Sequence, residues 1–465
     1  MKRFALTVSF ACLAVTGVAR AEVRSVGPGK TFAKPCAAFA AAVDGDIVEI
    51  DATGNYDGDV CAFAKNNLTI RGKGGRAKID AAGKSAGGKA IWVIQGADNV
   101  VEDIELSGCT VPDKNGAGIR QEGRSVTLRR VYLHDNENGI LTGANPDSVI
   151  VIEDSELARN GAGDGYSHNM YIGEVKSFTL RGSYSHHAKI GHLVKSRALV
   201  NLILYNRLTD ETGTASYEID LPQGGRSFVI GNVLQQSTTT DNPAFISFAR
   251  ESKRNPGTAL FAVNNTFFNA RSSGTFVAAA ADTGASVTLR NNIFAGPGTV
   301  CDQSTAVLDS NFVGDPQFVS AAAYDFHLKA GSPALEKGVA PGTGAGQSLA
   351  ALCQYVHPAH AVVRATVGAL DQGGFELGGE TTTPCGGTVP GDAGPMDSGV
   401  TTDAAAPGDD ATPASDAATA GDAGGSTDAP ASDEAGCGCR TTGRSAGSAL
   451  GLGLALFALA TRRRR

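Results

Sequence analysis

The stretch Gly165–Gly225 reads GYSHNMYIGEVKSFTLRGSYSHHAKIGHLVKSRALVNLILYNRLTDETGTASYEIDLPQGG. In it, short apolar runs alternate with polar residues and end at Gly, Asn or Asp. The run FTLRGS, centred on Gly182, is followed one period later by LILYNR at Asn206 and then by FVIGNV at Asn232. A common step in the twenties is typical of repeat proteins, so each run predicts one strand of a repeating coil.

Runs of the same kind extend this frame in both directions. Each combines β-branched or aromatic residues with a Gly, Asn or Asp that tolerates positive φ. Coils of this length suit a solenoid whose strands are parallel and about 4.8 Å apart. These further runs lie near Gly72, Asp103, Arg130, Asp154, Asn265 and Asn292.

The repeating runs resemble the right-handed parallel β-helix of the pectate-lyase-like superfamily, over Val23–Glu376. The resemblance implies an all-β fold and rests on structural motifs rather than catalytic ones. Asn residues at equivalent places would then form an internal ladder of stacked amides. This ladder would contain Asn206, Asn232, Asn265 and Asn292.

Composition agrees with a turn-rich β protein. The chain has 60 Gly, only 6% aromatic residues and a formal net charge of -7. Neither a basic stripe nor interleaved aromatic residues are present, so nucleic acid is not expected as a partner.

The two ends of the predicted solenoid carry capping signals. Residues 35–43 are Ala-rich with a helical pattern, and a short helix here would cover the first coil. At the other end, residues 315–335 (DPQFVSAAAYDFHLKAGSPAL) resemble the closing segment of secreted β-helix proteins.

The chain begins with features of export. Residues 1–21 combine a basic start, an apolar run and Ala19-Arg20-Ala21, which predicts a signal peptide cleaved after Ala21. In an oxidising compartment the six Cys of the mature domain favour disulfides, and Cys36 with Cys61 is the first expected pair.

Beyond the predicted β-helix domain (22–376) the composition changes. Residues 377–436 are rich in Gly, Ala, Thr, Pro and Asp, and we expect a disordered acidic linker. Residues 437–465 contain Cys-Gly-Cys, an apolar stretch expected to be helical, and four terminal Arg. This tail resembles the myxobacterial C-terminal sorting signals, which implies retention at the cell surface. An ordinary C-terminal membrane anchor is the alternative.

Candidate site residues follow from the repeat. Side chains one period apart form rows on the outer face of a solenoid. The spacing predicts two such rows: His168 with His192 and Glu218, and Tyr171 with Lys195 and Asp220. If Ile219 and Leu221 point inward, then Glu218 and Asp220 point outward by the two-residue alternation. Such a patch of His, Lys, Arg, Tyr and acids is a candidate active site.

The resemblance to polysaccharide lyases implies a uronate-containing polymer and cleavage by β-elimination. Lys195 would serve as the base if neighbouring cations such as Arg197 and a protonated His disfavour its charged form. Arg197 would hold the substrate carboxylate bidentately, and His192 or Tyr171 would deliver a proton, with His168 beside them. Substrate would also contact Asn169, His187, Glu218 and Glu251, and Ca²⁺ would bind Glu218 and Asp220.

Two other functions fit the same residues. A glycoside hydrolase would use Glu218 and Asp220, with Glu251 as a further carboxylate. A surface carbohydrate-binding protein or adhesin would use the patch without turnover. A zinc site formed by His168, His186, His187 and His192 is a weaker hypothesis. We expect a monomer that binds polysaccharide and reaches the membrane through its tail.

Overall fold

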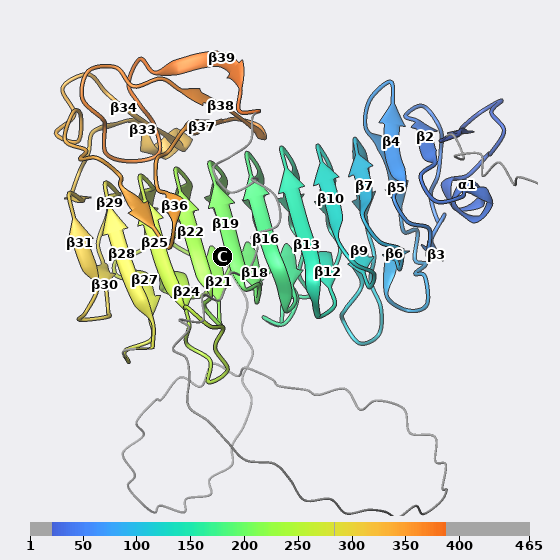
Figure 1. Ribbon diagram of the computed structural model, residues 1–465, viewed down its shortest axis with the longest axis horizontal. Coiled ribbons are helices and arrows are strands. Elements are labelled where there is room, and N and C mark those ends of the chain that lie inside the picture. The colour runs from blue at the N-terminus through green and yellow to red at the C-terminus, as the bar shows by residue number, and fades with distance from the viewer. Residues whose placement is uncertain (1–20, 283, 387–465) are drawn as a thin grey trace, which may run out of the picture. The chain divides into compact units, whose positions relative to one another are not determined.

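The computed structural model describes residues 21–282 and 284–386. They form a parallel β-solenoid of about 10 turns, followed by a smaller C-terminal subdomain (Figure 1). Neighbouring strands in each sheet are one coil apart in the sequence, which confirms the predicted repeat. The predicted signal peptide up to residue 20, the linker from residue 387 and the whole tail lie outside the described residues. No helix of the described part is long and apolar enough to cross a membrane.

Three sheets run along the solenoid, and each full coil visits them in the order A, C, B. Sheet A contains β1 (Val23–Val26), β2 (Ile47–Asp51), β4 (Thr69–Lys73), β7 (Asn99–Glu102), β10 (Val126–Arg129), β13 (Asn145–Glu153), β16 (Val175–Arg181), β19 (Val200–Leu204), β22 (Arg226–Ile230), β25 (Ala259–Val263), β28 (Ser286–Arg290) and β31 (Val307–Asp309). Sheet B contains β3 (Cys61–Phe63), β6 (Ala90–Ile94), β9 (Ala117–Gln121), β12 (Asn138–Thr142), β15 (Met170–Ile172), β18 (Val194–Ser196), β21 (Ile219–Leu221), β24 (Ala244–Phe248), β27 (Thr275–Ala279) and β30 (Thr299–Cys301). Sheet C contains β5 (Ala77–Asp80), β8 (Ile104–Ser107), β11 (Tyr132–His134), β14 (Glu156–Ala158), β17 (Tyr184–His186), β20 (Arg207–Thr209), β23 (Val233–Gln236), β26 (Thr266–Asn269), β29 (Ile293–Ala295) and β32 (Phe312–Val313).

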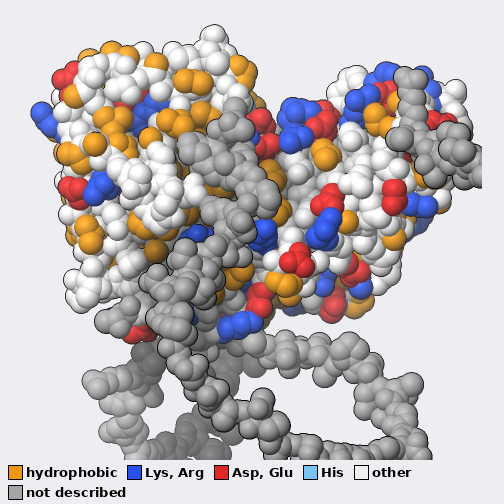
Figure 2. All heavy atoms as spheres, in the orientation of Figure 1, with side chains coloured by type: hydrophobic (Ala, Val, Ile, Leu, Met, Phe, Trp, Pro, Cys, Tyr) orange, Lys and Arg blue, Asp and Glu red, His pale blue; other side chains and the backbone are white. Residues whose placement is uncertain are grey.

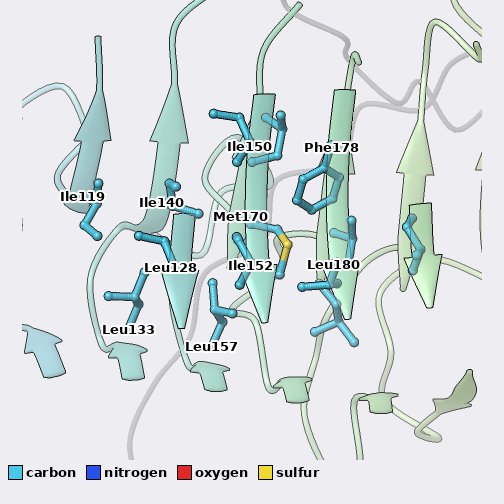
Figure 3. Packing of buried hydrophobic residues seen from close by; sticks show 14 of the residues in the cluster. Ile119, Leu128, Leu133, Ile140, Ile150, Ile152, Leu157, Met170, Phe178 and Leu180 are labelled. Carbon is cyan, nitrogen blue, oxygen red and sulfur yellow. The ribbon is translucent and has the colours of Figure 1, made fainter. Parts of the chain in front are cut away.

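The core is a column of aliphatic and aromatic side chains inside the three sheets. Ile150 and Ile152 of β13 pair with Phe178 and Leu180 of β16, and all four are fully buried (Figure 3). Alternate residues of each strand point inward, so a one-residue slip would expose the whole row. The apolar pattern therefore fixes the register between coils.

The predicted Asn ladder is confirmed. The backbone N–H groups of Asn206, Asn232 and Asn265 each donate to the Oδ1 atom of the next Asn at 2.9 Å, and Asn292 continues the row to Asn311 at 3.0 Å. The side-chain amides donate along the same row at 2.9 to 3.0 Å. All four predicted residues are fully buried, so the ladder satisfies polar groups at the corner between sheets A and C.

A second ladder, of charges, follows the outer face of sheet A. Acidic and basic residues alternate at laterally paired positions over successive coils, and Figure 2 shows both signs side by side on the visible face of the solenoid. The members are Glu49, Arg71, Glu102, Arg129, Glu153 and Arg181. The next residue in this row is Leu204, which is buried, because the chain beyond the solenoid covers it.

The helix α1 (Pro35–Ala41) covers the first coil, as predicted, and ends two residues before the expected boundary. Its Phe39 packs against Phe63 and Trp92, which closes this end of the core. The expected disulfide between Cys36 and Cys61 is present and joins the helix to sheet B.

The solenoid ends at Val313, so its predicted extent to Glu376 is wrong. The C-terminal subdomain (residues 314–386) forms antiparallel sheets instead. Its elements are β33 (Phe318–Ser320), η1 (Ala321–Ala323), β34 (Asp325–Leu328), β35 (Thr343–Gly344), β36 (Gln347–Ser348), β37 (Cys353–Val356), β38 (His360–Arg364) and β39 (Glu380–Pro384).

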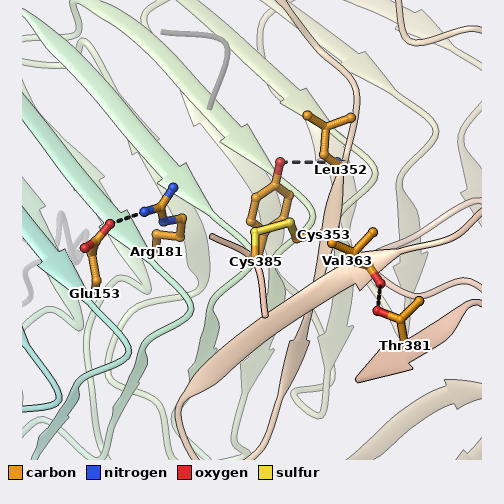
Figure 4. Close-up of a disulfide and its surroundings, with 8 residues drawn as sticks. Glu153, Arg181, Leu352, Cys353, Val363, Thr381 and Cys385 are labelled. Carbon is orange, nitrogen blue, oxygen red and sulfur yellow. Dashed lines mark hydrogen bonds and ion pairs between the residues drawn. A yellow bond between two sulfur atoms is a disulfide. The ribbon is translucent and has the colours of Figure 1, made fainter. Parts of the chain in front are cut away.

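The folded chain continues past the predicted linker boundary at Glu376. Strand β39 pairs with β38, and Thr381 Oγ1 donates to the Val363 carbonyl at 2.8 Å (Figure 4). A disulfide between Cys353 and Cys385 holds this segment. The two disulfides are consistent with export to an oxidising compartment.

Replacing one amide of the ladder should destabilise the whole column. In Asn232→Ala, the partners of this amide in neighbouring coils lose their hydrogen bonds inside the core, which should lower the free energy of unfolding by about 3 kcal/mol. Urea unfolding followed by circular dichroism measures this change. The exposed Asn115→Ala is the matched control, and equal midpoints for the two variants would contradict a stabilising ladder.

Candidate functional site

Three adjacent strands of sheet B bring predicted site residues into one row. Tyr171 of β15 is the lateral partner of Lys195 of β18, which is the lateral partner of Asp220 of β21. We call these three residues the sheet B row. The predicted spacing therefore gives true neighbours, although the residues are about a coil apart in the chain.

The amine of Lys195 lies in the middle of this row. Its Nζ atom is 3.6 Å from Asp220 Oδ2 and 5.2 Å from the ring centroid of Tyr171. The Lys195 side chain is 12% exposed, so neighbouring residues cover most of it and only a small part contacts solvent. Burial raises the pKa of Asp220, although Lys195 and a hydrogen bond with Ser247 act in the opposite direction.

His168 and His192 stack beside the row, as their spacing predicted. Their ring centroids are 4.4 Å apart and the planes differ by 12°. His168 Nδ1 accepts from the backbone N–H of His192 at 3.0 Å, and His192 Nδ1 accepts from that of Tyr217 at 3.3 Å. A backbone N–H can only donate, so in each neutral ring the proton is on Nε2.

Both imidazoles are neutral at pH 7. Burial holds the pKa of each ring well below its usual value, and the charge of Lys195 lowers it further. The expected protonated His beside Lys195 is therefore absent. His192 Nε2 lies 3.5 Å from Asp220 Oδ2, and His168 Nε2 is buried without a hydrogen-bond partner.

Arg197 already holds a carboxylate. Both terminal nitrogens of its guanidinium contact Glu251, with Nη2 donating to Oε1 at 2.8 Å, and its Nε donates to the Tyr171 hydroxyl at 2.9 Å. Burial alone would lower the pKa of Arg197, but the bonds to Glu251 and Tyr171 raise it. The fork predicted to bind substrate is thus filled by a side chain of the loop after β24.

Glu218 does not point outward as predicted. It precedes β21 at a corner of the coil, where strand alternation does not apply, and it is fully buried. Its Oε2 accepts from Gln236 at 2.9 Å, while Oε1 has no hydrogen-bond partner. Glu218 therefore does not share a surface with Asp220, and the two do not form the carboxylate pair of the hydrolase hypothesis.

Asn169 also lies inside the column. Its amide donates to the Leu157 carbonyl, Ser185 Oγ and the His186 carbonyl at 2.9 to 3.1 Å, and its Oδ1 accepts from Asn160. Asn169 has no exposed surface, and its polar atoms are all hydrogen-bonded within the protein. It therefore cannot make the expected contact with substrate.

His187 lies on another face. It follows β17 of sheet C, where its Nδ1 contacts His186 Nδ1 at 2.7 Å. Since His168 and His192 flank sheet B, the four His do not converge on one zinc ion. His187 is not one coil away from either His168 or His192, so the repeat does not bring it beside them.

The residues around the row do not fit a calcium ion either. Calcium takes about six to eight oxygen ligands, mostly from carboxylates and carbonyls. Here Asp220 contacts Lys195, and Glu251 contacts Arg197, while Glu218 is in the interior. In the described ranges no three His, Cys, Asp or Glu converge as metal ligands.

One neighbour of the row was missed. Ser247 of β24 is the lateral partner of Asp220 and bonds its carboxylate. Extending the same frame by one more coil would have found it. The large cavities lie elsewhere, along sheet C and the C-terminal subdomain.

Comparison with solved structures supports the fold. A pectate lyase, Pel9A, matches with a TM-score of 0.54 and 13% identity, covering 77% of this chain and 97% of that chain. An alginate lyase from Paenibacillus sp. str. FPU-7 matches with a TM-score of 0.37 and 13% identity, covering 63% of this chain and 99% of that one. ORF18 of Geobacillus virus E2 matches with a TM-score of 0.35 and 14% identity, covering 61% and 58%.

At such identities the likeness to the pectate lyase shows a shared β-helix fold and does not transfer an activity. No protein-family model and no curated protein sequence matches the chain.

The buried carboxyl of Glu218 should make stability depend on pH. Burial raises its pKa well above 4.5, so the folded chain keeps a proton that the unfolded chain releases above about pH 4.5. The free energy of unfolding therefore falls as pH rises toward the folded-state pKa. Glu218→Gln removes this dependence and should lose less stability between about pH 5 and about pH 8. Urea unfolding across this range measures it, with the exposed Glu22→Gln as control. Parallel curves for wild type and Glu218→Gln would contradict the buried acid.

Proposed function

We propose that the protein is a polysaccharide lyase that cleaves a uronate-containing polymer by β-elimination at the sheet B row. The observation that carries this proposal is the position of Lys195 between Tyr171 and Asp220 on an outer strand face. The β-helix fold is compatible with it. The reaction needs a base for the proton at C5, neutralisation of the uronate carboxylate and an acid for the leaving oxygen.

Lys195 is the proposed base. The cations expected beside it do not act as predicted, because both His rings are neutral and Arg197 is paired with Glu251. The amine must therefore first release a proton to solvent. In its neutral form, Nζ takes the C5 proton, and the electron pair of that bond forms the double bond between C4 and C5. Asp220, at 3.6 Å, then stabilises the ammonium that results.

Tyr171 is the proposed acid. The bond between C4 and the bridging oxygen breaks, and that oxygen takes the phenolic proton. Because the Tyr171 hydroxyl oxygen accepts from Arg197 Nε, the positive guanidinium stabilises the phenolate that forms. The Nε2–H group of His192 points to Asp220 Oδ2 and helps to orient this carboxylate.

The substrate carboxylate must displace Glu251 to reach Arg197. Glu251 occupies both terminal nitrogens of the guanidinium and is 23% exposed at its side chain. It lies in the loop between β24 and β25 rather than in a strand, so it is free to move without breaking a sheet. Glu251 thus acts as an internal competitor for the uronate.

The proposal includes export of the enzyme and its retention at the cell surface. The two disulfides suit an oxidising compartment. The sorting tail remains a sequence-based expectation, and fractionation of cells that express the full chain tests it.

Removing the amine should abolish turnover. Lys195→Ala should lower kcat/KM by about 10³-fold on a uronate polymer, since it removes the base. The ultraviolet absorbance of the unsaturated product, measured with pectate, alginate and glycosaminoglycans, checks this. The control is Lys176→Ala, an exposed lysine on sheet A.

No absorbance gain by the wild type on any of these polymers would contradict the lyase. Reducing ends without new absorbance would favour a hydrolase, and binding without turnover would favour the carbohydrate-binding alternative.

Removing the competitor should tighten substrate binding. Glu251→Gln frees Arg197 of a negative partner and should raise the affinity for galacturonate oligomers about tenfold, because less of the protein is in the blocked form. Calorimetric titration measures this on a Lys195→Ala background. Asp282→Asn, which removes another Arg partner from the surface, is the control. Unchanged affinity would show that Glu251 does not compete.

A further inference from the structure

A hollow lies on a different face of the solenoid from the sheet B row. It is a cleft of ≈ 670 Å³ between the outer face of sheet C and the C-terminal subdomain. Small-molecule sites in proteins have volumes of roughly 300 to 1,000 Å³, so the size suits a ligand. None of the predicted site residues lines it.

Four of the residues that line the cleft are Tyr or Phe and come from distant parts of the chain; Tyr324 is partly exposed and the other three are buried. Tyr324 and Phe326 are contributed by the first hairpin of the subdomain, Tyr355 by β37, and Phe375 by the segment before β39. Arg207 of β20 forms the floor, and its Nη1 donates to the Tyr324 carbonyl at 3.1 Å. The subdomain is thus fixed to the solenoid at the cleft.

The outer face of sheet C leads into this cleft through more rings. Tyr184 is the lateral partner of Arg207, whose guanidinium lies 5.4 Å from the tyrosine ring centroid. Tyr184 also stacks on His186 with centroids 4.0 Å apart, and the ring of His357 meets it edge-on at 5.3 Å. Tyr184 and His186 are both buried, so this stack packs beside the cleft and presents little free ring surface.

Carboxylates outnumber guanidinium groups around the cleft. Arg207 pairs with Glu211 at 3.0 Å, and His327 contacts Asp325 at 2.6 Å and Glu380 at 3.3 Å. Burial and the charge of Arg207 lower the pKa of His357. Because three carboxylates and one guanidinium surround the cleft, an anionic uronate would be repelled, and a neutral ligand suits it better.

Polar groups line the edge. His357 and His360 are exposed at the rim, as is Thr382 of β39. Imidazole nitrogens and hydroxyls both donate and accept hydrogen bonds. The partly exposed ring of Tyr324, together with such a rim, matches a sugar ring, which has apolar C–H faces and hydroxyl edges.

We propose that this cleft binds a short segment of an uncharged glycan, separately from the sheet B row. Such a site would hold the protein on a neutral polysaccharide while the other face remains free. It does not depend on the proposed lyase activity, because none of its residues belongs to the row.

Titration of the full chain with cellohexaose, xylohexaose and maltohexaose, by calorimetry and saturation-transfer NMR, tests the proposal. We expect binding of at least one of them. Tyr324→Ala and His357→Ala should each weaken it about tenfold, because each removes a ring or a rim hydrogen bond. Tyr166→Ala, which removes an exposed tyrosine elsewhere, and Lys195→Ala should leave it unchanged.

Absence of binding to all three neutral hexasaccharides would overturn the proposal, as would binding that Lys195→Ala abolishes. His357 is exposed, so its variant keeps the test decisive if Tyr324→Ala fails to fold. Unchanged affinity in a folded His357→Ala variant would also place the ligand outside the cleft.

Discussion

The lateral register between coils is the constraint on which this structure depends. Parallel strands with alternating apolar residues can stack in one way only, because a slip of one residue would turn the core outward. The Asn ladder adds a polar requirement at the corner, where each amide bonds the coil after it. Once this register is fixed, residues that are distant in the chain become neighbours on each outer face.

The same register brings different kinds of residues together on the three outer faces. On sheet A, alternating Glu and Arg pair along the column until the subdomain covers it with apolar contacts. On sheet B, Tyr171, Lys195 and Asp220 come together at the surface. On sheet C, rings and carboxylates lead toward the C-terminal subdomain. A repeat that is uniform inside thus carries a different chemistry on each side.

The sequence was informative wherever a contact repeats once per coil. A period in the twenties predicted the strands and the Asn ladder. It also predicted the stacked pair His168 and His192 and the partners of Lys195. Prediction failed where a residue sits at a corner. Glu218 was assigned to the surface by strand alternation, which does not hold one residue before a strand.

The repeat in the sequence also could not predict contacts made by loops or by the C-terminal subdomain. The pairing of Arg197 with Glu251 spans two coils through an irregular loop, so no period marks it. The antiparallel sheets after Val313 have no repeat, and the cleft exists only because they fold back on sheet C. Local composition could indicate the end of the solenoid but not where the following strands dock.

The central claim is that coil stacking places a uronate polymer across the sheet B row. A crystal structure of the Lys195→Ala chain with a bound oligouronate tests this most directly. We predict a sugar ring over β15, β18 and β21, its carboxylate on Arg197 and Glu251 displaced. An oligouronate bound on another face, or with Glu251 still paired to Arg197, would contradict the account.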